Sequence, residues 1–79
     1  MSGFVSVKEG LPKLPDEDYV SMIVIAACKN DNGKKWTVPL EYQRTLIHGK
    51  RVERWAYLWD RLFNFEVTHW MPLPEPPDD

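Results

Sequence analysis

The stretch Val20-Ser-Met-Ile-Val-Ile-Ala-Ala-Cys28, followed by Asn30-Asp-Asn-Gly33 and by Lys35-Trp-Thr-Val-Pro-Leu-Glu-Tyr-Gln43, decides the fold. Its first run is almost continuously apolar and rich in β-branched residues, which favours a strand covered on both faces. The dipeptide Asn32-Gly33 is typical of the positive-φ positions of a type I′ turn. The stretch therefore predicts a β-hairpin over residues 20–43.

The second strand of this hairpin alternates cleanly between apolar and polar residues. If the loop has two residues, Val38 lies opposite Ala27 and Leu40 lies opposite Ile25, so that apolar side chains meet on one face. Pro39 has no N–H to donate to a neighbouring strand. We therefore expect this strand to lie at an edge of the sheet or to be bulged at Pro39.

After Gly49 the periodicity changes. Apolar residues recur at helical spacing, which predicts one helix from about Lys50 to Phe63; they are Val52, Trp55, Ala56, Trp59, Leu62 and Phe63. The aromatic content of this segment also suits a strand. Residues 66–71 read as a last strand, and a Pro-rich extended tail follows at 72–79.

The predicted fold is thus α+β, with a small antiparallel sheet made of hairpin 20–43 and strand 66–71 and with one helix near 50–63. An all-β arrangement is the alternative. The 79 residues suffice for a single domain, 1–79, with a modest core. Such a short chain gains from burying an interface, which favours a homo-oligomer.

The charges are unevenly distributed, although the net charge is −2. Residues 29–61 hold eight Lys/Arg and four Asp/Glu, a balance of +4, and the two ends hold two lysines against eight acids, a balance of −6. The basic middle could bind phosphate groups through His48, Lys50, Arg51 and Arg54. A solvated, charged face is the alternative interpretation.

Two end motifs carry a resemblance. Phe4-Val-Ser-Val-Lys-Glu-Gly-Leu-Pro12 resembles the aromatic-x-Ser-Val-x-Glu-x-Leu-Pro opening of a family of small phage and prophage proteins, and Val67-Thr-His-Trp-Met-Pro-Leu-Pro-Glu-Pro-Pro77 is similar to its closing motif. The family is a domain of unknown function. The resemblance therefore implies an origin but no activity.

Reactive side chains are few. Cys28 is the only cysteine, and with His48 or His69 it would form the only candidate catalytic dyad. Cys28 ends a strand that is expected to be buried, so we interpret it as an inert apolar residue. Paired metal ligands are missing, and no phosphate loop or nucleophile motif is present. We expect no enzyme activity, no metal and no cofactor.

The leading hypothesis is a phage-type accessory protein that binds a host protein stoichiometrically, as an inhibitor or an adaptor. Ring-rich segments suit a binding surface, and the candidate contact residues are Arg54, Trp55, Tyr57, Trp59, His69, Trp70 and Met71. An oligomer that sequesters a nucleotide or another phosphorylated signalling molecule is the second hypothesis, and nucleic-acid binding is the third. The lone cysteine and the lack of a membrane-length apolar run predict a location in a cytoplasm, away from membranes. The resemblance to phage proteins implies that this is the cytoplasm of the bacterial host.

Overall fold

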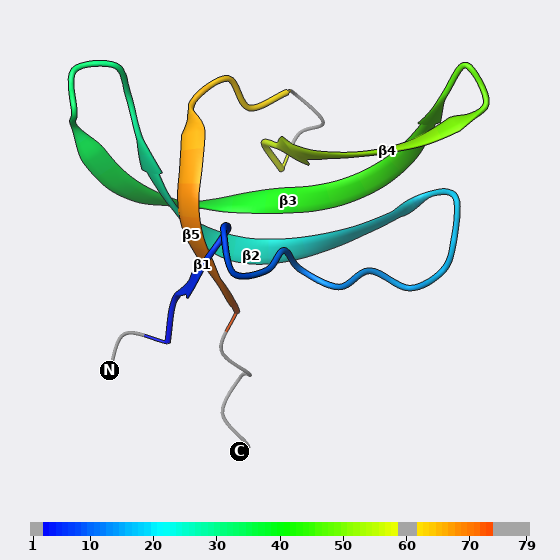
Figure 1. Ribbon diagram of the computed structural model, residues 1–79, viewed down its shortest axis with the longest axis horizontal. Helices are drawn as coiled ribbons and strands as arrows, with labels where there is room; N and C mark the ends of the chain where they lie inside the picture. Colours follow the sequence, from blue (N-terminus) through cyan, green and yellow to red (C-terminus); the bar gives the residue numbers. More distant parts are fainter. Residues whose placement is uncertain (1–2, 59–61, 74–79) are drawn as a thin grey trace.

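The computed structural model describes residues 3–58 and 62–73, which form one antiparallel sheet of five strands. The strands are β1 (Val5–Ser6), β2 (Val20–Lys29), β3 (Lys35–Ile47), β4 (Lys50–Ala56) and β5 (Glu66–Pro72). Their order across the sheet is β1-β5-β2-β3-β4. Figure 1 shows the long strands β2 and β3 curving side by side, with the β2–β3 and β3–β4 turns at opposite ends.

The predicted α+β class is wrong, and the all-β alternative is the arrangement found. No helix occurs in residues 3–58 or 62–73. The segment expected to be a helix near 50–63 begins as β4, which pairs with β3 from Glu41 to Ile47. The reason is the turn, where His48 (φ 52°) and Gly49 (φ 78°) both have positive φ and form a two-residue loop. Such a loop has the type I′ geometry that returns the chain beside the strand it left.

The hairpin of β2 and β3 is confirmed, but its register differs from the prediction by one residue. Leu40 lies opposite Val24, and Val38 lies opposite Ala26. The residues of β3 that were expected to share a face still do so, because a shift of β2 against β3 leaves the alternation within β3 unchanged. The shift does change which β2 residues lie on the same face as these β3 residues.

The turn between these strands explains the shift. Its loop has three residues, because the Asn30 N–H donates to the Lys34 carbonyl oxygen at 3.0 Å. The Gly33 N–H donates to the Asn30 carbonyl oxygen at 3.0 Å, and Gly33 has φ 84°. The Asn30 side chain completes the turn, since its Oδ1 accepts hydrogen bonds from the N–H groups of Asn32 and Lys34 at 2.9 and 3.0 Å. A type I turn followed by a left-handed glycine fits a three-residue hairpin loop.

The position of Pro39 is consistent with its missing N–H. Strand β3 lies inside the sheet, but it pairs with β4 only from Glu41 onward. Pro39 pairs with Ile25 of β2 and precedes that part of β3. At Pro39 itself the outer side of β3 is therefore a local sheet edge, where proline is tolerated.

The predicted last strand is confirmed as β5, which lies between β1 and β2. Val5 pairs with Trp70, and Ser6 pairs with His69. The opening and closing motifs of the sequence therefore meet in the sheet. Residues 74–79 of the Pro-rich tail and Trp59 lie outside the described residues.

One face of the sheet, the inner face, carries the core. Fully buried side chains at its centre are Val24, Ala26, Cys28 and Leu40. Tyr57 and Phe63 pack against this cluster from the segment between β4 and β5. On the same face, opposite Ala26, Trp70 holds the segment before β2, because its Nε1–H donates to the Gly10 carbonyl oxygen at 2.9 Å.

The opposite face, here called the open face, presents the alternate residues of the same strands. Ile23 is 43% exposed, Pro39 is exposed, and Ile25 and Met71 are half-buried. The apolar run of β2 was expected to be covered on both faces. It is covered mainly on the inner one, which leaves aliphatic side chains at the surface.

Candidate binding surfaces

The acidic N-terminal part of the chain folds back onto the basic middle. Arg51 forms ion pairs with Asp16 at 2.6 Å and with Asp18 at 3.0 Å. Arg44 Nη2 lies 3.0 Å from Glu53 Oε2. Its Nη1 also donates to the carbonyl oxygen of Pro15 at 2.6 Å. The guanidinium of Arg51 lowers the pKa of Asp16 by hydrogen bonding and by its charge. Part of the positive charge seen in the sequence is therefore neutralised within the molecule.

Glu53 is the centre of a second polar contact on the inner face. The buried Tyr42 hydroxyl donates to Glu53 Oε1 at 2.8 Å. Hydrogen bonds from Tyr42 and Arg44 lower the pKa of Glu53, and burial raises the pKa of Tyr42. These contacts link β3 to β4 and hold the Glu53 carboxylate against Tyr42 and Arg44.

The structure does not bring the predicted phosphate-binding residues together. His48 lies in the β3–β4 turn and Lys50 directly follows that turn. Arg51 is directed toward Asp16 and Asp18 on the inner face. Arg54 has the opposite orientation on β4, and its Nε–H donates to Gln43 Oε1 at 2.9 Å. Successive residues of a strand point to opposite faces, so these four side chains do not converge.

Several of the predicted contact rings belong to the packing of the inner face. Trp55 packs on Tyr42 with ring centroids 4.7 Å apart, and Tyr57 packs on Phe63 at 5.2 Å. Trp70 is half-buried, with its indole N–H bonded to Gly10. These rings hold the covering segments in place.

His69 and Met71, by contrast, share the open face with aliphatic residues that sequence reasoning missed. Met71 pairs with Ile25 across β5 and β2, and His69 pairs with Ala27. Together with Ile23 they form the apolar centre of this face. The unbroken apolar run of β2 could have indicated this exposed aliphatic patch. It was interpreted as a strand covered on both faces, although so short a chain has few residues left to cover both.

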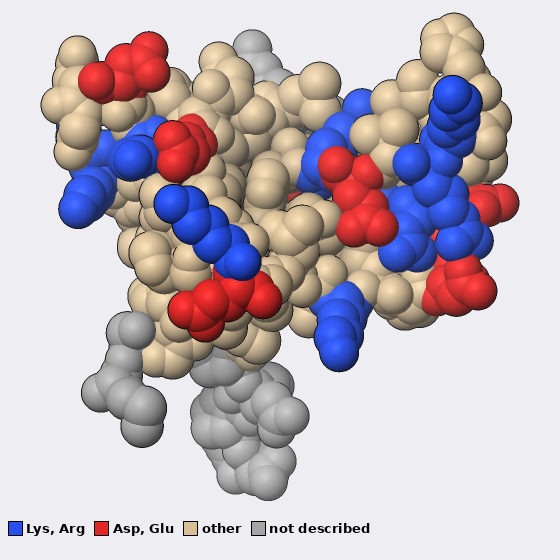
Figure 2. Space-filling view, viewed as in Figure 1, with Lys and Arg blue, Asp and Glu red and all other residues tan. Residues whose placement is uncertain are grey.

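The charged residues on the open face have an excess of cations. By register it carries Lys29, Lys35, Lys50 and Arg54, against Glu41 and Glu66, a balance of +2. The whole chain carries −2. On the side of the molecule that Figure 2 shows, which is not the open face alone, charged side chains of both signs lie intermingled.

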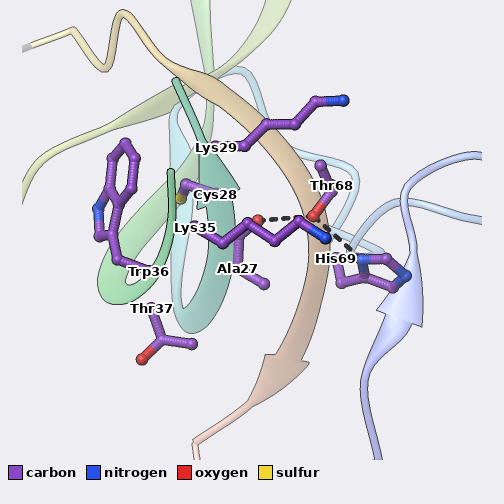
Figure 3. Close-up of a pocket in the computed structure, with 8 residues that line it drawn as sticks. All are labelled: Ala27, Cys28, Lys29, Lys35, Trp36, Thr37, Thr68 and His69. Carbon is purple, nitrogen blue, oxygen red and sulfur yellow. Dashed lines mark hydrogen bonds between the residues drawn. The ribbon is translucent and has the colours of Figure 1, made fainter. Parts of the chain in front are cut away.

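A cavity of about 450 Å³ opens beside the junction of β2, β3 and β5. It is lined by Ala27, Lys35, Thr37, Thr68 and His69 together with neighbouring residues. In Figure 3 the Lys35 side chain extends in the direction of Thr68 and His69. The cavity contains His69 of the predicted contact set and Cys28, which the sequence offered as a dyad partner of His69. Its other lining residues were not indicated by the sequence.

Cys28 is a buried residue with a raised thiol pKa. Its side chain is 1% exposed in the core of the inner face, and burial raises the pKa of its thiol to about 11. A thiol that is protonated and inaccessible at neutral pH is a poor nucleophile. Across residues 3–58 and 62–73, no three His, Cys, Asp or Glu side chains come together as a metal site would require.

Fold and surfaces together define a small all-β domain built on a single sheet, with one covered face, one open face and a cavity lined by residues of β2, β3 and β5. The chain belongs to the family described as "Protein of unknown function (DUF551)", whose sequence model matches residues 3–78. Comparisons with curated proteins and with solved structures gave no match. Within the described part of the chain, no helix is long and apolar enough to span a membrane.

Proposed function

We propose that this protein acts by stoichiometric binding of another protein through the open face of its sheet, and that it does not turn over a substrate. The observation that supports this is the exposure of Ile23, at 43%, beside half-buried Ile25 and Met71. A contiguous apolar patch rimmed by polar side chains is typical of an interaction site. The resemblance of the end motifs to small phage proteins favours a host protein as the target.

The charges around the patch indicate the chemistry of that partner. The cationic excess of the open face would attract a surface whose apolar centre is bordered by acidic groups. Arg54 supports this assignment, since it lies on the open face and arginine is frequent at binding hot spots. Inhibition or adaptation of the host protein would follow from covering that acidic surface.

The experiment compares two lysine substitutions at residues that are similarly exposed in the wild type. Ile23→Lys places a charge in the open face, whereas Leu11→Lys changes a residue that is 45% exposed in the segment before β2. Proteins captured by the tagged wild type are purified and titrated against all three forms by calorimetry. We expect one partner per chain, a loss of at least about 30-fold in affinity for Ile23→Lys, and no change for Leu11→Lys. Circular dichroism checks that both variants fold.

Three results would overturn the proposal. One is a partner that binds Ile23→Lys as tightly as it binds the wild type. A second is self-association measured by light scattering and lost in Ile23→Lys, which would make the open face a contact between copies of this chain. The third is turnover of a compound by the purified protein, abolished by replacing His69.

A further inference from the structure

We infer that the cavity beside the bulge of β5 binds a small organic anion that carries a flat apolar part, such as an aryl phosphate or an aryl carboxylate. The volume of about 450 Å³ lies within the usual range of small-molecule sites. The cavity would hold its ligand without the protein partner proposed above, so the two ideas can fail separately.

The bulge creates the cavity wall. Ala27 pairs with His69, but the next residue, Cys28, pairs with Val67, so that Thr68 is an extra residue in β5. Bulges of this kind redirect side chains and are frequent beside functional sites. Here Thr68 and His69 both line the cavity.

A chain of hydrogen bonds fixes the orientation of the imidazole. The Thr68 hydroxyl donates its single hydrogen to the Ala27 carbonyl oxygen at 3.1 Å. His69 Nδ1 lies 3.0 Å from the same hydroxyl oxygen, which has no second hydrogen to give. The hydroxyl oxygen must therefore accept a hydrogen bond, and the Nδ1–H of His69 donates it. An imidazole held in this way gives the exposed edge of the cavity a flat wall with a defined orientation, against which an aromatic ring can stack.

Two lysines supply the charge. Lys29 and Lys35 lie directly opposite each other on β2 and β3, and both line the cavity. Like charges in cross-strand positions destabilise a sheet. Glu66 compensates only in part, because its carboxylate lies 3.8 Å from Lys29 Nζ and both side chains are well exposed. An anion between the two ammonium groups would relieve their repulsion, which makes this pair a reason to expect a ligand.

A second, smaller hollow extends the same site. It measures about 190 Å³, shares Lys29, Thr68 and His69 with the first, and adds Lys8 together with the acidic Glu66. Three lysines and one glutamate therefore line the two hollows beside Thr68 and His69, which leaves a balance of +2. The methyl groups of Ala27 and Thr37 provide the apolar part of the main cavity. This distribution suits a ligand with one charged end and one apolar end.

The test uses phenyl phosphate, benzoate, inorganic phosphate and phenol as probes at low ionic strength, with binding measured by NMR titration of the full chain. We expect phenyl phosphate or benzoate to bind more tightly than inorganic phosphate or phenol and to shift the resonances of Thr68 and His69. Comparing the affinities of phenyl phosphate and benzoate shows whether the lysines bind a phosphate or a carboxylate group more tightly.

Matched variants locate the site. Lys35→Gln should weaken the aryl anion by about tenfold, whereas Lys34→Gln, the same change at an exposed neighbour in the turn, should alter affinity by less than about twofold. His69→Ala should weaken phenyl phosphate but leave inorganic phosphate unchanged. Equal losses in the two lysine variants would show nonspecific attraction and overturn the inference. Absence of binding by every probe would also overturn it, while leaving the proposal for the open face intact.

Discussion

The turn between β2 and β3 yields a prediction that separates the observed register from the one expected for an Asn-Gly two-residue loop. In the structure the side chain of Asn30 accepts two backbone hydrogen bonds, at 2.9 and 3.0 Å. Among the described non-glycine residues only His48 has positive φ. Asn32 therefore lacks the left-handed backbone geometry for which asparagine is preferred over alanine. Substitution of Asn30 should therefore be costly, and substitution of Asn32 should not.

The magnitude follows from those two bonds. A typical hydrogen bond contributes about 0.5–1.5 kcal/mol net, and these two are solvent-exposed. We therefore expect Asn30→Ala to lower the free energy of unfolding by about 1–2 kcal/mol, near the lower end for two bonds. Asn32→Ala should stay within about 0.5 kcal/mol of wild type, as surface substitutions usually do. In a domain of this size, 1 kcal/mol corresponds to a shift in Tm of about 4–8 °C.

The assay is thermal and urea unfolding followed by tryptophan fluorescence, with Asn30→Asp as the control that keeps an acceptor oxygen. The alternative register reverses the order of the two substitutions, because Asn32 would then occupy a positive-φ position that alanine tolerates poorly. If Asn32→Ala proves more destabilising than Asn30→Ala, our account of the turn and of the register is refuted.

Three further predictions concern the other turn, the core and the inner-face contacts. Gly49→Ala should lower the free energy of unfolding by about 1–2 kcal/mol, because φ is +78° and an alanine is strained there. No atom crowds the added methyl group, so the backbone strain is the whole cost; a neutral result in chemical unfolding would contradict the type I′ turn. Cys28 should react with a thiol reagent at least about 100-fold more slowly in the folded than in the unfolded protein, because burial raises its pKa from 9.0 to about 11; equal rates would show an accessible thiol. Glu53→Gln should destabilise the protein near neutral pH. Because the pKa of folded Glu53 lies below its ordinary value of 4.5, this difference should persist above pH 4.5 and shrink as the pH falls through the lowered pKa; a gap that widens in acid would refute the sign.

The error at residues 50–63 has a specific physical cause. Val52, Trp55 and Ala56 suit a helical stripe, but the same segment also has a period of two, which places Arg51 and Glu53 on the inner face. That period is decided by partners far away in the sequence, since Arg51 meets Asp16 and Glu53 meets Arg44. Local spacing cannot show which charges will be neighbours. A two-residue loop at His48-Gly49 was also hard to foresee, because histidine is uncommon at positive φ.

The candidate surfaces also contain some residues that the sequence indicated and others that it did not. His69 and Met71 were among the predicted contact residues, and the structure places both on the open face beside Ile23 and Ile25. That they contact a partner stays a prediction. The cavity could not be foreseen, because a bulge of one residue in β5 brings Thr68 to Ala27. A bulge depends on the register of two strands that are about forty residues apart in the chain.

The sequence by itself determined the two long strands, their hairpin and the last strand, because alternation and turn residues are local properties of the chain. Only the tertiary structure decided the one-residue register, the strand at 50–56 and which face of β2 stays open. These features depend on strand pairing and on ion pairs between residues that are distant in the sequence. Such interactions stabilise the protein only after the chain has folded and brought those residues together.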